Sequence, residues 1–207
     1  MSNKQLLDDF FKSNTVDSET PSAQALTHFH IKIGRNPDTR DNIQNLVNEF
    51  TEKHKPERKE KSLLSLRKIE TATTYEQLIR IMRKGVDLMN CNLLINKVLE
   101  YEDEIVPDIT KRLKTSMNDN FTELSVRILA RSNINVTDEV VGYYEDMRCP
   151  YSQSLVLVLL GFIADESYIP WLIEKYDELK ALYPNESYCD GAYYALYEIE
   201  NRLSSQR

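Results

Sequence analysis

Residues 160–172 have the sequence LGFIADESYIPWL, and this stretch decides the fold. It joins an apolar segment to a second segment that opens with Pro170. A proline in the first turn of a helix gives up no hydrogen bond that the helix would have made, and an acid ahead of it, here Asp165, can cap free backbone N–H groups. The stretch therefore predicts the tight turn between the two helices of a hairpin.

The composition extends this prediction to the whole chain. The 207 residues include only five Gly and seven Pro, and aliphatic residues recur at helical spacing more often than they alternate. A rival interpretation makes Leu155–Leu160 a buried strand. Ser152 and Ser154 as possible caps, and the proline-opened helix that follows, favour a helix instead. We expect a single all-α domain over residues 1–207.

The N-terminal part has the pattern of separate short helices. Thr74 and Gln77 form a capping box that opens a helix ending near Gly85. The basic stretch Lys53–Lys61 is either a solvated connection or the exposed first turns of the next helix. Three amphipathic stripes precede this basic stretch, at Leu6–Phe11, Leu26–Ile33 and Ile43–Phe50. Pro21 lies where the second of these helices could begin.

From about residue 88 the chain repeats itself. Each copy has a helix-length apolar segment, a turn and a second amphipathic stretch, so the repeating unit is a helical hairpin. A hairpin cannot bury its apolar face alone and must stack on neighbours, which predicts a short array. The three turns lie at offsets of 31 and 32 residues, at Ile105–Asp108, Val136–Glu139 and Tyr168–Trp171.

The third copy resembles a HEAT repeat. The residues at the signature positions of that family are Leu160, Gly161, Ile163, Asp165, Ile169, Pro170 and Leu172. In the second copy, Asp138 replaces the proline of the signature. The resemblance implies a short right-handed α-solenoid of stacked antiparallel helix pairs over residues 88–207. Residues 1–87 would then be N-terminal helices that cap or extend the stack.

Charge is unevenly distributed along the chain. The net charge is −7, with 15 Lys and Arg against 13 Asp and Glu in residues 1–90, and 11 against 20 in residues 91–207. An acidic surface repels phosphate backbones and attracts basic proteins, which disfavours nucleic acid as a partner. The chain start lacks the apolar run of a secretion signal, and Leu155–Ala164 is about half the roughly 20 residues that cross a bilayer. We expect a cytoplasmic protein without a membrane span.

No pattern of residues predicts catalysis, a cofactor or a metal site. His28 and His30 would point about 200° apart on a helix, and the sequence has no Gly-rich phosphate loop and no CxxC pair. Pairs of acids could share general acid and base work, but they recur once per repeat at helix junctions, which favours capping. These pairs are Asp103–Glu104, Asp138–Glu139 and Asp165–Glu166.

Aromatic residues gather in the C-terminal part. Ten of the twelve Tyr and the only Trp follow residue 140. On the last helix, Tyr193, Tyr194 and Tyr197 fall off the stripe of small and aliphatic residues, and Trp171 projects away from the apolar face of its own helix. Two interpretations are open: the rings pack against an adjacent repeat, or they are exposed anchors for a protein partner.

The functional hypothesis is a non-enzymatic protein-binding scaffold. Its acidic, Tyr-rich C-terminal surface would dock a basic or amphipathic protein segment, with the aromatic rings as apolar anchors and the acids steering the partner. The residues assigned to this surface are Trp171, Glu174, Glu178, Asp190, Tyr193, Tyr194 and Tyr197.

Two alternatives stay open. The resemblance implies the first, because some HEAT-like proteins are DNA glycosylases that excise alkylated purines from a basic groove. The acidic charge of the second half argues against that activity. The second alternative is a homodimer in which Tyr193, Tyr194 and Tyr197 bury against their counterparts.

Overall fold

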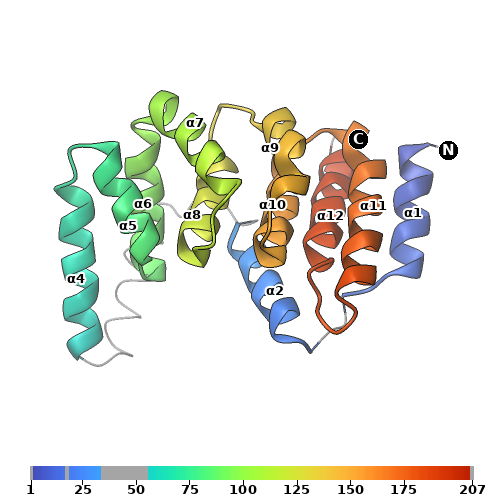
Figure 1. The fold of residues 1–207 in the computed structure, drawn as a ribbon, viewed down its shortest axis with the longest axis horizontal. Coiled ribbons are helices and arrows are strands. Elements are labelled where there is room, and N and C mark those ends of the chain that lie inside the picture. The colour runs from blue at the N-terminus through green and yellow to red at the C-terminus, as the bar shows by residue number, and fades with distance from the viewer. Residues whose placement is uncertain (1, 17–18, 34–55, 206–207) are drawn as a thin grey trace.

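The computed structural model describes residues 2–16, 19–33 and 56–205, and over these residues the chain is all-helical, with no β-strand (Figure 1). The all-α prediction is confirmed. The helix predicted over Ile43–Phe50 lies outside the described residues. The α-helices are α1 (Asn3–Ser13), α2 (Pro21–Ile33), α4 (Pro56–Glu70), α5 (Tyr75–Lys84), α6 (Leu88–Leu99), α7 (Glu102–Leu113), α8 (Asp119–Leu129), α9 (Thr137–Tyr143), α10 (Pro150–Ile163), α11 (Ile169–Leu182) and α12 (Asp190–Ser205).

The helices from α4 to α12 are arranged in a row along the long axis of the molecule (Figure 1). Within the row, α6, α8, α10 and α12 pack in succession, and the most extensive contact joins α10 to α12. Helices α6, α8 and α10 begin at Leu88, Asp119 and Pro150, so 31 residues separate each start from the next. A regular spacing of 31 residues is thus present in the helices themselves.

The stretch 160–172 folds into the predicted turn. α10 ends at Ile163, and a short 3₁₀ turn, Glu166–Tyr168, leads into α11, whose second residue is Pro170. The carboxylate of Asp165 accepts a hydrogen bond of 2.8 Å from the backbone N–H of Ser167 and so caps the 3₁₀ turn. The predicted cap and the predicted proline-opened helix are both confirmed.

The helix α10 is the centre of the core. Every residue from Leu155 to Leu160 is buried, which explains why this segment lacks the polar stripe of an amphipathic helix and could be mistaken for a strand. α10 meets α12 through small residues: a Cβ added to Gly161 would lie 2.6 Å from the Cα of Ala195. No helix among the described residues is both long enough and apolar enough to span a membrane.

The turn predicted at Ile105–Asp108 is wrong. α7 already begins at Glu102, and Pro107 lies inside this helix and does not open it. The acids Glu102–Glu104 occupy the first turn, where negative charge is favourable at the positive end of the helix dipole. The junction between α6 and α7 is therefore Glu100–Tyr101, ahead of the proline that the pattern used as a marker.

Local signals in the N-terminal part are confirmed. α2 begins at Pro21, and Thr74 caps α5 by accepting a hydrogen bond from the backbone N–H of Gln77. α5 ends before Gly85, whose φ of 71° is the left-handed conformation that glycine adopts most easily. The described part of the basic stretch, from Pro56 onward, forms the first turns of α4.

α1 lies at the end of the row opposite α4, beside α11, whereas α2 lies along the middle of the row, near α8 and α10 (Figure 1). α1 packs against α11, and α2 packs against α12 and α10. Buried apolar side chains form one continuous cluster that begins with Leu7 of α1 and ends with Ile199 of α12. The start of the chain therefore completes the core around its C-terminal helices.

Candidate functional site

Two of the seven residues assigned to the aromatic surface are buried, so the expectation that they are exposed is wrong. Tyr194 is 9% exposed, its ring stacks on the His30 ring with 4.3 Å between centroids, and its hydroxyl lies 2.6 Å from Oγ1 of Thr27. Asp190 is 4% exposed at the start of α12. His30 and Thr27 belong to α2, which covers this face of α12. Because 167 residues separate Thr27 from Tyr194, no local pattern could reveal the contact.

Burial has an electrostatic consequence at Asp190. Loss of solvation raises the pKa of its carboxyl group to about 6, because the charged form is disfavoured away from water. Oδ1 accepts a weak hydrogen bond from the Cys189 thiol at 3.8 Å, and Oδ2 is buried without a hydrogen-bond partner among the described residues. Asp190 is therefore a buried carboxylate that cannot steer a partner.

Tyr193 and Trp171 are half-buried against neighbouring helices. The ring of Tyr193 packs edge to face on Phe11 of α1, with 5.2 Å between centroids. The indole of Trp171 packs edge to face on Tyr144 at 5.2 Å, and Nζ of Lys175 lies 5.6 Å from the indole centroid. For both rings the structure follows the first interpretation, packing against neighbouring helices.

The other three assigned residues retain solvent contact. Tyr197 is 43% exposed and Glu174 is exposed, whereas Glu178 accepts a hydrogen bond of 2.7 Å from the buried Lys175. Lys175 also pairs with Glu145, so Glu178 belongs to a local ion-pair cluster. The chain itself thus takes up most of the surface that the sequence assigned to a partner.

A different surface, on one edge of the molecule, stays open. Here the turns between helices are tied to each other by hydrogen bonds between residues 28 to 31 positions apart. Tyr101 donates to the carbonyl of Thr73, and Ser132 donates to the carboxylate of Glu102 at 2.7 Å. These bonds fix the turn before α7 against the turn before α5, and the turn before α9 against the start of α7. They give the edge a defined shape although it consists of loops.

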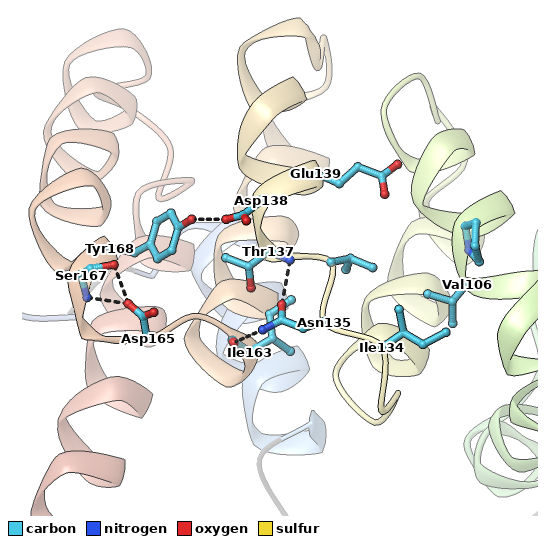
Figure 2. Close-up of a pocket in the computed structure, with 12 residues that line it drawn as sticks. Val106, Ile134, Asn135, Thr137, Asp138, Glu139, Ile163, Asp165, Ser167 and Tyr168 are labelled. Carbon is cyan, nitrogen blue, oxygen red and sulfur yellow. Dashed lines mark hydrogen bonds between the residues drawn. The ribbon is translucent and has the colours of Figure 1, made fainter.

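A cavity of about 640 Å³ lies along this edge, between α7, the start of α9 and the turn from α10 to α11 (Figure 2). Val106, Ile134 and Ile163 line its apolar part. Its polar part is acidic, and none of the described residues that line it is Lys or Arg. Asp138, Glu139 and Asp165 are all exposed there, and we call this feature the acidic cavity.

Neighbouring groups fix two of the three carboxylates. Tyr168 donates its hydroxyl proton to Asp138 at 2.6 Å, as Figure 2 shows. The hydroxyl and the backbone N–H of Ser167 donate to Asp165, and these hydrogen bonds lower the pKa of the Asp165 carboxyl group. Asp165 is therefore ionised at neutral pH, which suits it to bind a cation and not to act as a general acid.

Thr137, in the wall of the acidic cavity, carries an unsatisfied polar group. The residue is 5% exposed, and its Oγ1 has no hydrogen-bond partner among the described residues. Figure 2 shows the hydroxyl oxygen directed between Asn135 and Asp165. A buried hydroxyl without a partner costs about 1–3 kcal/mol, so a donor that reached this oxygen would be favourable.

The arrangement suits a Lys or Arg side chain better than a metal ion or a proton-transfer reaction. Ionised carboxylates only accept hydrogen bonds, and a hydroxyl oxygen can accept them. Such a set of acceptors matches an ammonium or guanidinium group, which has several N–H donors. Within the described ranges, no three His, Cys, Asp or Glu side chains come together as a metal site would require. His30, on α2, is 9% exposed and forms a hydrogen bond of 2.6 Å with Glu198.

Comparison with protein-family models, with curated proteins and with solved structures finds no match to this chain. The sequence contained a signal for the cavity, since both acids of the pair Asp138–Glu139 and one acid of the pair Asp165–Glu166 line it, but capping explains only part of the pattern. Asp165 does cap a turn, whereas α9 begins at Thr137 without a side-chain cap, and Asp138 and Glu139 stay exposed in its first turn.

Proposed function

We propose that this chain is a non-enzymatic protein-binding module whose acidic cavity receives a Lys or Arg side chain from a basic or amphipathic segment of a partner protein. The observation that carries the proposal is the unpaired, buried hydroxyl of Thr137 beside the exposed carboxylates of Asp138, Glu139 and Asp165. A cation in the cavity would pair with Asp138 or Asp165 on one side or with Glu139 on the other, since Figure 2 shows the Glu139 carboxylate directed away from the other two. The proposed partner surface is therefore the edge of the molecule that holds the acidic cavity, and not the tyrosines of α12.

Charge distribution supports the same class of partner. Residues 91–207 carry 20 acids against 11 bases, so the second half attracts basic segments over a distance and raises their association rate. The apolar part of the cavity, lined by Val106, Ile134 and Ile163, offers contact to the stem of a long side chain. A segment with both basic and apolar side chains fits the cavity better than a purely basic one.

The proposal includes a finer account of the fold and of the location. We infer that α6 to α12 form a HEAT-like stack of antiparallel helix pairs, which the spacing of 31 residues between helix starts and the hydrogen bonds between turns support. The protein would act in the cytoplasm, where exposed acids and reduced cysteines are usual. Its role would be that of a scaffold and not of an enzyme.

A binding measurement tests the cavity directly. The probe is a fluorescein-labelled amphipathic peptide built of Lys and Leu, with a peptide of Glu and Leu as the charge-reversed control. Fluorescence anisotropy at low and high salt gives the affinity for the wild-type chain and its variants. We expect the double variant Asp138→Asn, Glu139→Gln to bind the Lys peptide about tenfold more weakly, since 1.4 kcal/mol corresponds to a factor of ten.

A charge-matched variant separates the cavity from net charge. Glu60→Gln with Glu70→Gln removes the same charge from two exposed residues of α4, and we expect it to leave the affinity within about twofold. Thr137→Val, which keeps the size of the side chain, should weaken binding without any change in charge. Equal losses in the two double variants would overturn the proposal, because they would show a general electrostatic attraction.

A further inference from the structure

Two further cavities lie on the edge of the molecule opposite the acidic cavity. Their volumes are about 410 Å³ and about 440 Å³. Asn118, at the start of α8, lines the first of them, whereas Ile134 and Asn135, beyond the end of the same helix, line the acidic cavity. A helix of 11 residues is about 16 Å long, so the length of α8 separates the two edges.

Basic side chains line both cavities, which we call the basic pockets. Arg83 and Arg112 line the first pocket, and Lys61 and Lys84 line the second. Arg83, Lys61 and Lys84 are exposed, and none of the three forms an ion pair within the described part of the chain. Arg112 donates to Asp108 at 2.7 Å through Nε alone. Positive charge without a counter-ion therefore lines both pockets.

The chain supplies few acids to these pockets. None of the described residues that line the first pocket is Asp or Glu, and Asp87 is the one acid among those that line the second. The Asp87 carboxylate caps α6, since it accepts a hydrogen bond of 3.0 Å from the backbone N–H of Asn90. Anionic groups for the bases must therefore come from solution or from another molecule.

The walls of the basic pockets are held together by specific contacts. The side chain of Asn118 donates to the carbonyl of Arg83 at 3.1 Å, and its Oδ1 accepts from the backbone N–H of Phe121. A Cβ added to Gly85 would lie 2.7 Å from Oδ1 of Asn120, so the turn after α5 packs closely on the start of α8. The guanidinium carbon of Arg83 lies 5.9 Å from the ring centroid of Phe121, within the range of a cation–π contact. The pockets therefore have a defined shape before any ligand binds.

We propose that the basic pockets bind an acidic segment of a partner protein, with a carboxylate in each pocket. Guanidinium and ammonium groups without counter-ions match carboxylates in charge and in hydrogen-bond donors. Met117, which is 72% exposed, lines the first pocket, and the half-buried Val86 lines the second. These two side chains offer apolar contact to the same segment. The chain thus has a second binding surface, opposite in charge to the acidic cavity.

A nucleic acid fits the basic pockets less well than a protein segment. Residues 91–207 carry 20 acids against 11 bases, and this charge repels a long phosphate backbone that extends beyond the pockets. Single strands also need exposed aromatic rings on which their bases stack. Phe121 is the one aromatic residue among the described residues that line the pockets, and it is 1% exposed. A short acidic segment of a protein avoids both costs.

The test compares two variants of the full-length chain. Arg83→Gln with Lys84→Gln removes the two bases in the last turn of α5. The control, Arg67→Gln with Lys68→Gln, removes the same residue types from the last turn of α4, where they are exposed and line neither basic pocket. Bases in a last turn also favour the helix dipole, and both variants lose that contribution alike. The probe is the fluorescein-labelled peptide of Glu and Leu, and fluorescence anisotropy at low salt gives its affinity.

We expect the α5 variant to bind the Glu peptide about tenfold more weakly, and the α4 control to stay within about twofold of the wild type. Lys61→Gln, in the other pocket, should weaken binding about threefold without any change to α5. Affinity for the peptide of Lys and Leu should stay within about twofold in all three, so the result does not depend on the acidic cavity.

Three results would overturn the proposal. The first is that the wild-type chain does not bind the Glu peptide. The second is an equal loss of affinity in the α5 variant and the α4 control, which would show a general electrostatic attraction. The third is tighter binding of an oligothymidylate with the same net charge as the Glu peptide, which would show a nucleic-acid site.

Discussion

The C-terminal aromatic face and the acidic cavity differ in what covers them. Both carry the residue types that bind proteins, tyrosines in one place and carboxylates in the other. The tyrosine face is covered by α1 and α2, which we call the N-terminal arm, so Tyr194 is 9% exposed, whereas Asp138, Glu139 and Asp165 face solvent. Residue type alone therefore does not locate a binding surface. A surface is free only if no other part of the same chain is complementary to it.

The first prediction concerns the covered face and removes a buried side chain of α2. Leu26→Ala removes the side chain of a residue of α2 that is 0% exposed, on a helix that packs against α10 and α12. We expect the free energy of unfolding to fall by about 2–5 kcal/mol, because the lost apolar contact leaves a cavity. Urea denaturation followed by far-ultraviolet circular dichroism measures the change.

The control for Leu26→Ala is the same substitution at Leu63. Leu63 is 46% exposed on α4, so its truncation should change stability by no more than about 0.5 kcal/mol. Similar small effects at the two positions would mean that the arm adds little to the core.

The second prediction compares how the stability contributions of Asp190 and Asp165 depend on pH. Burial raises the pKa of Asp190 from 3.8 to about 6, so the folded chain binds the proton more tightly than the unfolded chain between these values. The contribution of Asp190 to stability therefore falls as pH rises through this range and stays lower above it. Asp190→Asn should stabilise the protein by about 1–3 kcal/mol at pH 7, where the wild type has a buried charge, and have little effect below pH 3.8.

At the acidic cavity the sign is reversed. Hydrogen bonds from Ser167 lower the pKa of Asp165, so its contribution to stability is present above its ordinary pKa and is lost as pH falls. Asp165→Asn should consequently destabilise the chain at pH 7, with a smaller difference at acid pH. Thermal unfolding of both variants across the pH range measures the two trends. Parallel trends for Asp190 and Asp165 would contradict the assignment of one carboxylate as buried and the other as solvated.

The third and smallest prediction uses two tyrosines of the same helix. Tyr194→Phe removes the hydroxyl that lies 2.6 Å from Oγ1 of Thr27 and should cost about 0.5–1.5 kcal/mol. Tyr197→Phe removes a hydroxyl from a side chain that is 43% exposed, and we expect a change below about 0.5 kcal/mol. Chemical denaturation of the two variants side by side gives the difference, which would vanish if the arm did not dock on Tyr194.

Local sequence signals predicted the helices well because each signal acts within a few residues. Asp165 and Pro170 mark the turn that precedes α11, and Thr74 marks the start of α5. Pro107 misled the prediction, since a proline can lie inside a helix when other residues, here Glu102–Glu104, supply the favourable first turn. The exact junctions therefore depended on competition between signals and not on one residue.

The candidate site was harder to predict, for a different reason. The repeated acid pairs were visible in the sequence, but whether a carboxylate caps a helix or faces a cavity depends on the neighbouring turn. Asp165 caps its own turn, whereas Asp138 accepts from Tyr168, a residue 30 positions away. Likewise, the amphipathic pattern of α12 placed Tyr194 off the apolar stripe, and only the distant α2 made that second face buried.

The sequence by itself determined that the chain is helical, where most helices begin and end, and that its second half is acidic. These properties follow from backbone propensities, caps and charge, all of which act locally or simply add up. Only the tertiary structure decided which side chains are covered, because the N-terminal arm packs on α10, α11 and α12, which lie more than half the chain away in sequence. Burial of Tyr194 and Asp190, and the openness of the acidic cavity, are consequences of that long-range contact and of the packing of turns.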